Sequence, residues 1–255
     1  MNKKVLLVGE SWESSATHVK GFDQFYSTTF HTGSTYFIDA LRDTNYDVTY
    51  MCAHQAAKEF PLSLEDMHKW DVIILSDIGA NTLLLHPDTW LKSKRTANRL
   101  TLIHDYVAGG GSLMMIGGYF SFQGINGAAR YHRTPVEKVL PVQCLPYDDR
   151  VEAPEGHHVE IVNGDDPILN GINGDWPWLL GYNEVTLHPE AKLLATLAET
   201  GLPLLATREY QQGKTLAWTS DMAEHWLPEE FCNWEGYRQL WLNCLDWLTG
   251  ETYGD

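Results

Sequence analysis

The sequence predicts an α/β fold built on a doubly wound, mainly parallel sheet with helices on both faces. Two observations support this. In the first half of the chain, short apolar runs that suit buried strands alternate with helical patterns. In the second half, β-rich segments follow one another closely, which predicts a mixed or antiparallel extension of the sheet. Because no repeat or low-complexity linker divides the 255 residues, we expect a single domain over residues 1–255.

Four strands are expected in the first half. Two of them, Val5–Val8 and Val72–Leu75, are continuous apolar runs typical of strands buried on both faces. A third, over residues 46–52, alternates and is rich in β-forming residues. The fourth, over residues 112–116, ends at Gly117-Gly118. Apolar spacing and capping residues predict helices between these strands, over residues 32–42, 63–70 and 100–107.

The second half is less regular and is predicted to contain more strands than helices. A turn over Glu209–Gly213 separates two β-rich segments and predicts a hairpin. From Trp234 to Leu248 the apolar residues keep helical spacing, so we expect a closing amphipathic helix packed on the sheet. The expected strands cover residues 158–162, 184–187, 202–207 and 215–219.

Composition and charge exclude several functional classes. With 18 Lys and Arg against 34 Asp and Glu, the net charge is −16, which repels a phosphate backbone, so no nucleic-acid partner is expected. No apolar run approaches 18 residues and no signal peptide is recognisable, so we expect a cytoplasmic protein that does not span a membrane. The four cysteines lie far apart without a CxxC pair and are expected to be free thiols.

Ligands in such folds bind beyond the carboxyl ends of the parallel strands, and polar residues follow four of the expected strands there. Because neighbouring parallel strands end at one rim, we predict that these residues surround one cleft. As ligand-binding residues we expect Glu10, Ser11, Asp77, Asn81, Gly118 and Tyr119. As catalytic residues we expect Ser121, Asp221 and His225.

The stretch after the fourth strand has the glycines of a nucleophile elbow, a sharp turn that lifts a side chain above the sheet. At its centre, however, stands Tyr119 instead of serine or cysteine. Ser121 would serve as nucleophile in a shifted turn, and the alternative is an ordinary loop serine. The amides of Gly118 and Tyr119 are the candidate oxyanion donors.

Other patterns are weaker. His188-Pro189-Glu190 matches a base-and-carboxylate triplet of amidotransferases, but a match of three residues is also expected by coincidence. Trp176 and Trp178 could stack on a sugar or simply pack in a loop. No His, Cys, Asp or Glu pattern has metal-ligand spacing, and the glycine-rich stretches fit no nucleotide motif, so neither a metal nor another cofactor is expected.

Several longer strings resemble the glutamine amidotransferase-like proteins of the class I glutamine amidotransferase-like superfamily, over nearly the whole chain. They include Gly9–Trp12, Lys20–Asp23, Leu75–Asn81, Met115–Gly124, Asp148–Glu152 and Thr219–Met222 with His225-Trp226. The resemblance implies a flavodoxin-like sheet. True class I amidotransferases, which this sequence resembles, also have an elbow cysteine that attacks glutamine and a histidine that acts as the base. This sequence has Gly118 and Tyr119 at the elbow, so the usual thiol mechanism is not expected.

These observations leave three functional hypotheses open. The first is a domain that kept the fold, lacks glutaminase activity and binds an unknown small polar ligand or a protein partner. The alternative is a non-thiol hydrolase of a small polar or sugar-like substrate that uses rim carboxylates and His225. The third is a glutaminase whose cysteine comes from elsewhere in the fold. A homo-oligomer is compatible with all three.

Overall fold

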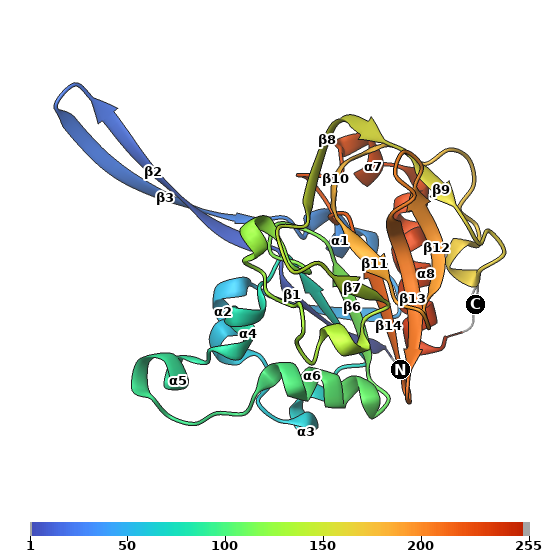
Figure 1. Ribbon diagram of the computed structural model, residues 1–255, viewed down its shortest axis with the longest axis horizontal. Helices are drawn as coiled ribbons and strands as arrows, with labels where there is room; N and C mark the ends of the chain where they lie inside the picture. Colours follow the sequence, from blue (N-terminus) through green and yellow to red (C-terminus); the bar gives the residue numbers. More distant parts are fainter. Residues whose placement is uncertain (1, 252–255) are drawn as a thin grey trace.

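The computed structural model describes residues 2–251, and its central feature is an eight-stranded mixed sheet (Figure 1). The first five strands in spatial order run parallel to one another, and each of the last three is antiparallel to its neighbour. In order across the sheet, the strands are β4 (Tyr46–Met51), β1 (Lys3–Gly9), β5 (Val72–Ser76), β6 (Ser112–Ile116), β14 (Gly213–Trp218), β13 (Pro203–Tyr210), β12 (Lys192–Leu197) and β9 (Val159–Ile161).

This order confirms the predicted doubly wound, flavodoxin-like sheet with an antiparallel extension in the C-terminal half. The chain starts at β1, moves outward to β4 and then returns across β1 to β5 and β6. Moreover, β14 pairs in parallel with β6, from Lys214 opposite Ser112 to Trp218 opposite Ile116. The carboxyl ends of β1, β5, β6 and β14 therefore meet at one rim.

Alternate side chains of the parallel strands pack into two separate apolar cores, one on each face of the sheet. Leu7 belongs to one core with Trp241, whereas Leu6 belongs to the other with Ile103. Burial on both sides explains why these strands are continuous apolar runs. The first core includes residues of α1 (Thr35–Ala40), α7 (Glu229–Cys232) and α8 (Glu235–Thr249), and the second includes residues of α2 (Ala53–Glu59), α3 (Leu64–Met67), α4 (Ala80–Leu84) and α6 (Arg99–Ala108).

Smaller elements surround the sheet. One predicted strand lies outside it: β11 (Val185–Leu187) pairs with β7 (Val142–Cys144) in a separate ribbon, because the intervening β12 takes the place beside β13. A second ribbon pairs β8 (Arg150–His157) with β10 (Leu179–Asn183). The remaining helical segments are α5 (Pro87–Lys92) and the 3₁₀ turns η1 (Ile125–Gly127), η2 (Glu137–Val139) and η3 (Pro167–Leu169).

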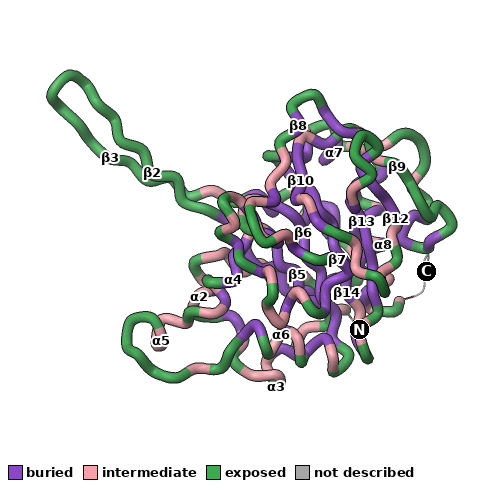
Figure 2. The backbone as a smooth tube through the Cα atoms, in the orientation of Figure 1, coloured by how far each residue is buried: buried purple, intermediate pink, exposed green. Residues whose placement is uncertain are grey.

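A long hairpin, here called the arm (residues 11–32), projects from the body between β1 and α1 (Figure 1). Its strands β2 (Ser11–Lys20) and β3 (Asp23–Thr32) pair along their full length. Almost all of the arm is exposed, as the green hairpin in Figure 2 shows. The sequence did not predict it. No helix among residues 2–251 is long and apolar enough to cross a membrane.

Candidate functional site

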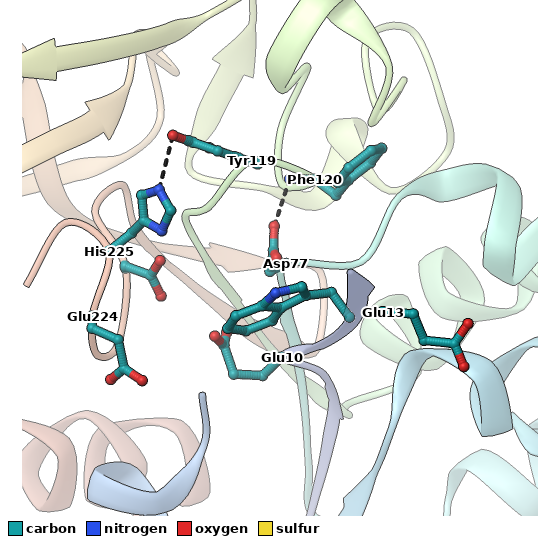
Figure 3. A pocket seen from close by; sticks show the side chains of 9 residues that line it. Glu10, Glu13, Asp77, Tyr119, Phe120, Glu224 and His225 are labelled. Carbon is teal, nitrogen blue, oxygen red and sulfur yellow. Dashed lines mark hydrogen bonds between the residues drawn. The ribbon is translucent and has the colours of Figure 1, made fainter. Parts of the chain in front are cut away.

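Residues that follow β1, β5, β6 and β14 line one cavity of about 370 Å³ at the carboxyl rim of the sheet (Figure 3). This confirms the predicted convergence for Glu10, Asp77, Tyr119, Asp221 and His225, which come from four separate segments of the chain. Five of the nine lining residues are acidic and three are aromatic. The complete lining is Glu10, Trp12, Glu13, Asp77, Tyr119, Phe120, Asp221, Glu224 and His225.

Glu10 is almost completely buried, with 2% of its surface exposed. Its backbone takes a left-handed conformation (φ +47°), which is uncommon for a non-glycine residue and typical of functional sites. The carboxyl accepts a hydrogen bond of 2.5 Å from the Ser76 hydroxyl, and a Cβ on Gly33 would lie only 2.5 Å from its Oε1. Burial, together with the nearby Asp77 carboxyl, raises the pKa of Glu10 to about 8. Glu10 is therefore mostly a protonated acid at neutral pH.

Asp77 occupies the equivalent place after β5 and is also left-handed (φ +45°). Its Oδ1 accepts a hydrogen bond of 2.6 Å from the Phe120 amide, and a Cβ on Gly118 would lie 2.9 Å from the same oxygen. Burial raises the pKa of Asp77, and the Phe120 amide and His225 partly offset this effect. The glycine after β6 thus gives the Asp77 carboxyl the room to reach the neighbouring turn.

Asp221 follows β14 and is buried beside both of these acids. Its Oδ1 accepts a hydrogen bond of 2.7 Å from the Met222 amide. Burial, and then the Glu10 and Asp77 carboxyls, raise the pKa of Asp221 well above its usual value. Burial and mutual repulsion therefore raise the pKa of all three carboxyls, and Glu10, with its pKa of about 8, donates as well as accepts hydrogen bonds near neutral pH.

Tyr119 and His225 lie together on one wall of the cavity (Figure 3). The Tyr119 hydroxyl donates to Glu152 Oε1 at 2.9 Å and lies 2.9 Å from His225 Nε2. Since the phenol proton goes to Glu152, His225 Nε2–H is the donor in the second bond. The Trp226 indole donates to the other Glu152 oxygen at 3.2 Å, and the Arg150 guanidinium lies 5.5 Å from the Tyr119 ring centre. Burial and the Glu152 carboxylate raise the pKa of Tyr119.

The turn after β6 differs from a working elbow. The Gly118 amide donates to Asn183 Oδ1 at 2.9 Å, and Asn183 Nδ2 donates to the Gly118 carbonyl and to Asp149 Oδ1. The predicted use of the Gly118 amide as an oxyanion donor is therefore wrong, because a buried side chain occupies it. Asp149 also accepts from the amides of Gln123 and Gly124, which fixes the loop that follows.

The remaining candidate residues lie outside the cavity lining. The buried Ser121 hydroxyl donates to the Ile116 carbonyl and accepts from the Asp77 amide at 3.1 Å. This geometry favours a positioning role for Ser121, since its hydroxyl holds the backbone of Asp77. The Ser11 hydroxyl accepts from the Ala53 amide at 2.8 Å and anchors the base of the arm. Asn81 is exposed on α4.

Sequence reasoning missed four lining residues as individual candidates. Trp12 and Phe120 stood inside the segments that were expected at the rim, and Glu224 directly precedes His225, so position next to a strand end was the available signal. Glu13 carried no such signal, because its place depends on the arm.

The other sequence patterns lie elsewhere. His188 lines a different cavity of about 530 Å³ together with Cys144, and the Glu190 carboxylate pairs with Arg208 at 2.5 Å. Burial raises the pKa of the thiols of Cys144, Cys232 and Cys244. Trp176 packs against Trp218 and Trp234, whereas Trp178 is exposed. Within residues 2–251, no three His, Cys, Asp or Glu side chains form a metal-binding group.

Comparison with known proteins places this geometry in a family. The cytoplasmic proteins STM3548 and STM1381 of Salmonella typhimurium are 42% and 41% identical to the chain, with TM-scores of 0.92 and 0.91. Each match covers 96% of this chain, and 98% and 99% of the respective relative. Their description agrees with the cytoplasmic location predicted from the sequence.

A ThuA-like protein from Bacteroides uniformis is 11% identical with a TM-score of 0.59, over 99% of this chain and 93% of its own, which shows the shared fold alone. No curated protein matches the sequence significantly. A family model described as "Putative glutamine amidotransferase" (GATase1-like) matches residues 4–250. The chain therefore belongs to the GATase1-like family.

Proposed function

We propose that the rim cavity binds a small, polyhydroxylated ligand that is uncharged or positively charged, and that the protein does not hydrolyse glutamine. The observation that carries the proposal is the lining: five carboxyl groups and three aromatic rings surround about 370 Å³, and none of the nine residues is Lys or Arg. A cavity of this size suits a single small molecule.

The raised pKa values of the three innermost acids favour hydroxyl groups as ligand chemistry. Glu10, with a pKa of about 8, donates as well as accepts near neutral pH. Hydroxyl groups also donate and accept, so a polyol satisfies such a mixed set, whereas five acidic side chains without a Lys or Arg among the lining residues disfavour a phosphate or carboxylate. The rings of Trp12, Tyr119 and Phe120 supply apolar surface for the C–H faces of a sugar.

The absence of glutaminase chemistry is inferred from the elbow. The Tyr119 hydroxyl is committed to Glu152 and His225, and its raised pKa makes it a poor nucleophile at neutral pH. The buried thiols of Cys144, Cys232 and Cys244 lie outside the lining of the cavity and are held protonated. The test measures ammonia release from glutamine, and none is expected. Release that is proportional to the protein concentration and persists in Tyr119→Phe and Asp77→Asn would show that glutamine is hydrolysed at a different site.

Matched ligands test the binding proposal. Glucose and glucosamine, as neutral and cationic probes, are expected to raise the Tm, whereas glucose 6-phosphate and gluconate are not. In Asp77→Asn the response to glucosamine should weaken most, because a carboxylate is lost. Glu65→Gln, on the distant α3, is the control. An equal or larger response to the two anionic probes would refute the proposal.

The grouping of several carboxyls in one cavity, one of them with a pKa of about 8, also supports a second candidate, a non-thiol hydrolase of the same class of ligand. Glu10 would act as general acid, and Asp77 or Asp221 as general base, with Tyr119 and His225 orienting the substrate. Incubation with p-nitrophenyl glycosides distinguishes the two functions. Turnover that disappears in Glu10→Gln supports the hydrolase, and binding without turnover supports the ligand-binding domain.

A further inference from the structure

Glu152 is not one of the lining residues, but it is bonded to the wall of the cavity that Tyr119 and His225 form. It belongs to β8, where it stands opposite Gly181 of the neighbouring strand β10. A Cβ on Gly181 would collide with the Trp226 ring, so glycine at this position lets the indole pack against the ribbon. The indole N–H then reaches the same carboxylate as the Tyr119 hydroxyl. The ribbon thus places one carboxylate against two residues of the wall region.

The hydrogen bonds around this carboxylate all run toward it. The Tyr119 hydroxyl donates to Glu152 Oε1 at 2.9 Å, and the Trp226 indole donates to Oε2 at 3.2 Å. An ionised carboxylate only accepts, so it takes the phenol proton and leaves the Tyr119 oxygen as an acceptor. His225 Nε2, which lies 2.9 Å from that oxygen, then carries a proton. The carboxylate therefore determines which nitrogen of the neutral His225 ring is protonated.

The other ring nitrogen of His225, Nδ1, is the one left for a ligand. It is turned away from Tyr119, and the ring stands between Tyr119 and the acids of the cavity (Figure 3). Within residues 2–251, no group forms a hydrogen bond with Nδ1. In a neutral ring with Nε2–H, Nδ1 accepts a hydrogen bond and cannot donate one. This wall of the cavity therefore offers an acceptor.

Arg150 favours the same arrangement. Its guanidinium lies 3.9 Å from Glu152 Oε1 and 5.5 Å from the centre of the Tyr119 ring. A cation at this distance stabilises the ionised form of a carboxylate. Arg150 thus helps to keep Glu152 in the form that only accepts hydrogen bonds.

We propose that Glu152 is a positioning residue that holds His225 in the Nε2–H tautomer through the Tyr119 hydroxyl, and thereby presents Nδ1 to the ligand as a fixed acceptor. A fixed acceptor selects ligand groups that donate, such as an ammonium group, over groups that only accept. It therefore favours amino sugars within the proposed class of ligands. This preference rests on the function proposed above, whereas the tautomer of His225 does not depend on any ligand.

Nitrogen NMR of the full chain without ligand tests the tautomer. At about pH 9, where imidazole rings are neutral, long-range proton–nitrogen spectra distinguish the two tautomers, and His225→Gln identifies the signals of His225. In wild type the Nε2–H form should exceed the Nδ1–H form about tenfold, a ratio that the net free energy of one hydrogen bond supports. Equal populations, or an excess of Nδ1–H, would overturn the proposal.

Glu152→Gln should reverse the tautomer. The amide offers one oxygen to two donors, and Trp226 can only donate, whereas the Tyr119 hydroxyl can also accept. The amide oxygen therefore faces Trp226, the amide NH₂ donates to Tyr119, and Tyr119 donates to His225 Nε2. The Nδ1–H form should then predominate by roughly threefold or more, and an unchanged ratio would contradict the proposal. Glu160→Gln, which removes an exposed carboxylate of β9, is the control and should keep the wild-type ratio.

Two further variants test the path of the effect. In Tyr119→Phe no hydroxyl links the carboxylate to the ring, so adding Glu152→Gln should leave the tautomer ratio unchanged. Adding Trp226→Phe to Glu152→Gln removes the competing donor, so the amide oxygen can turn to Tyr119 and the Nε2–H form should return. A reversal by Glu152→Gln that persists without the Tyr119 hydroxyl would refute the path through Tyr119.

Ligand binding measures the consequence for the cavity. Glucosamine, whose ammonium group only donates, should lose most of its Tm response in Glu152→Gln, whereas glucose, whose hydroxyl groups also accept, should keep most of its own. Equal losses for the two sugars would overturn the fixed acceptor. If wild type responds to neither sugar but Glu152→Gln still reverses the tautomer, the proposed ligand is wrong and the positioning role of Glu152 is supported.

Discussion

The rim cavity and the arm both depart from the usual distribution of side chains, in which acids are exposed and large apolar side chains are buried. The cavity takes the acids Glu10 and Asp221 out of water, whereas the arm leaves Phe22 and Tyr26 in water. Both arrangements cost free energy in the isolated chain. In the cavity, rigid strand ends and hydrogen-bond donors of the same molecule offset this free-energy cost. Along the arm, the exposed apolar side chains have no comparable contacts with the body of the molecule. The difference separates a preformed site from a ribbon that stays exposed to solvent.

Two glycines should give the largest contrast between these regions. A Cβ on Gly117 would lie 2.3 Å from the Thr219 carbonyl, so Gly117→Ala forces β6 and β14 apart and should lower the free energy of unfolding by about 3 kcal/mol or more. Gly21, in the arm turn, has φ +66° and open space around it, so Gly21→Ala should cost only about 1 kcal/mol. Urea unfolding of both variants measures the difference, and equal losses would contradict it.

Glu10 should give the cavity a pH dependence. Its pKa of about 8 lies above the value in the unfolded chain, so between about pH 4.5 and 8 the folded protein binds more protons than the unfolded chain. The contribution of Glu10 to stability is therefore fully present below pH 4.5 and is lost as the pH rises through 8. Glu10→Gln should flatten this decline and be more stable than wild type at pH 8.5, as measured by urea unfolding. Glu13→Gln, which removes an exposed acid of the arm, serves as control, and the same flattening there would argue against burial as the cause.

The amide of Asn183 should matter next. It is completely buried and bridges Gly118 to Asp149, so Asn183→Ala leaves the Gly118 amide without its acceptor. We expect a loss of about 2 kcal/mol of unfolding free energy and a weaker Tm response to glucosamine, because the turn that carries Tyr119 loosens. Exposed Gln24→Ala in the arm is the matched control, with a change of less than about 0.5 kcal/mol. A loss confined to stability, with ligand response unchanged, would mean that the turn does not shape the cavity.

The smallest effect is expected at the tip of the arm. Phe22 is fully exposed, so Phe22→Ser should change the unfolding free energy by less than about 0.5 kcal/mol, as measured by urea unfolding. A substantial loss would mean that the tip packs on the body of the molecule.

The sequence predicted the sheet better than the arm for a physical reason. Strands such as β1 and β5 are buried on both faces, so their apolar runs are unmistakable. The arm is exposed on both faces, and no core imposes a hydrophobic alternation on residues 11–32. Pairing β14 beside β6 required the correct strand direction, which the sequence alone left open.

In the candidate site, too, some features could be predicted from the sequence and others could not. Glu10, Asp77 and Asp221 were predictable because Glu10 and Asp77 directly follow strands of the parallel sheet and Asp221 comes three residues after β14. The hydrogen bonds of the Ser121 hydroxyl and of the Gly118 amide were not predictable. Their partners are Ile116 and Asp77 for Ser121 and the distant Asn183 for Gly118. Hydrogen-bond partners so far apart in sequence leave no local pattern.

Between the end of β1 and the start of the arm there is no linker. Glu10 alone separates β1 from Ser11, and Trp12 and Glu13 line the cavity while belonging to the ribbon. Occupancy of the cavity and the position of the arm are therefore not independent variables. If contact of the arm with another molecule changes the affinity of the cavity for a ligand by some factor, the ligand must change the affinity of the arm for that molecule by the same factor.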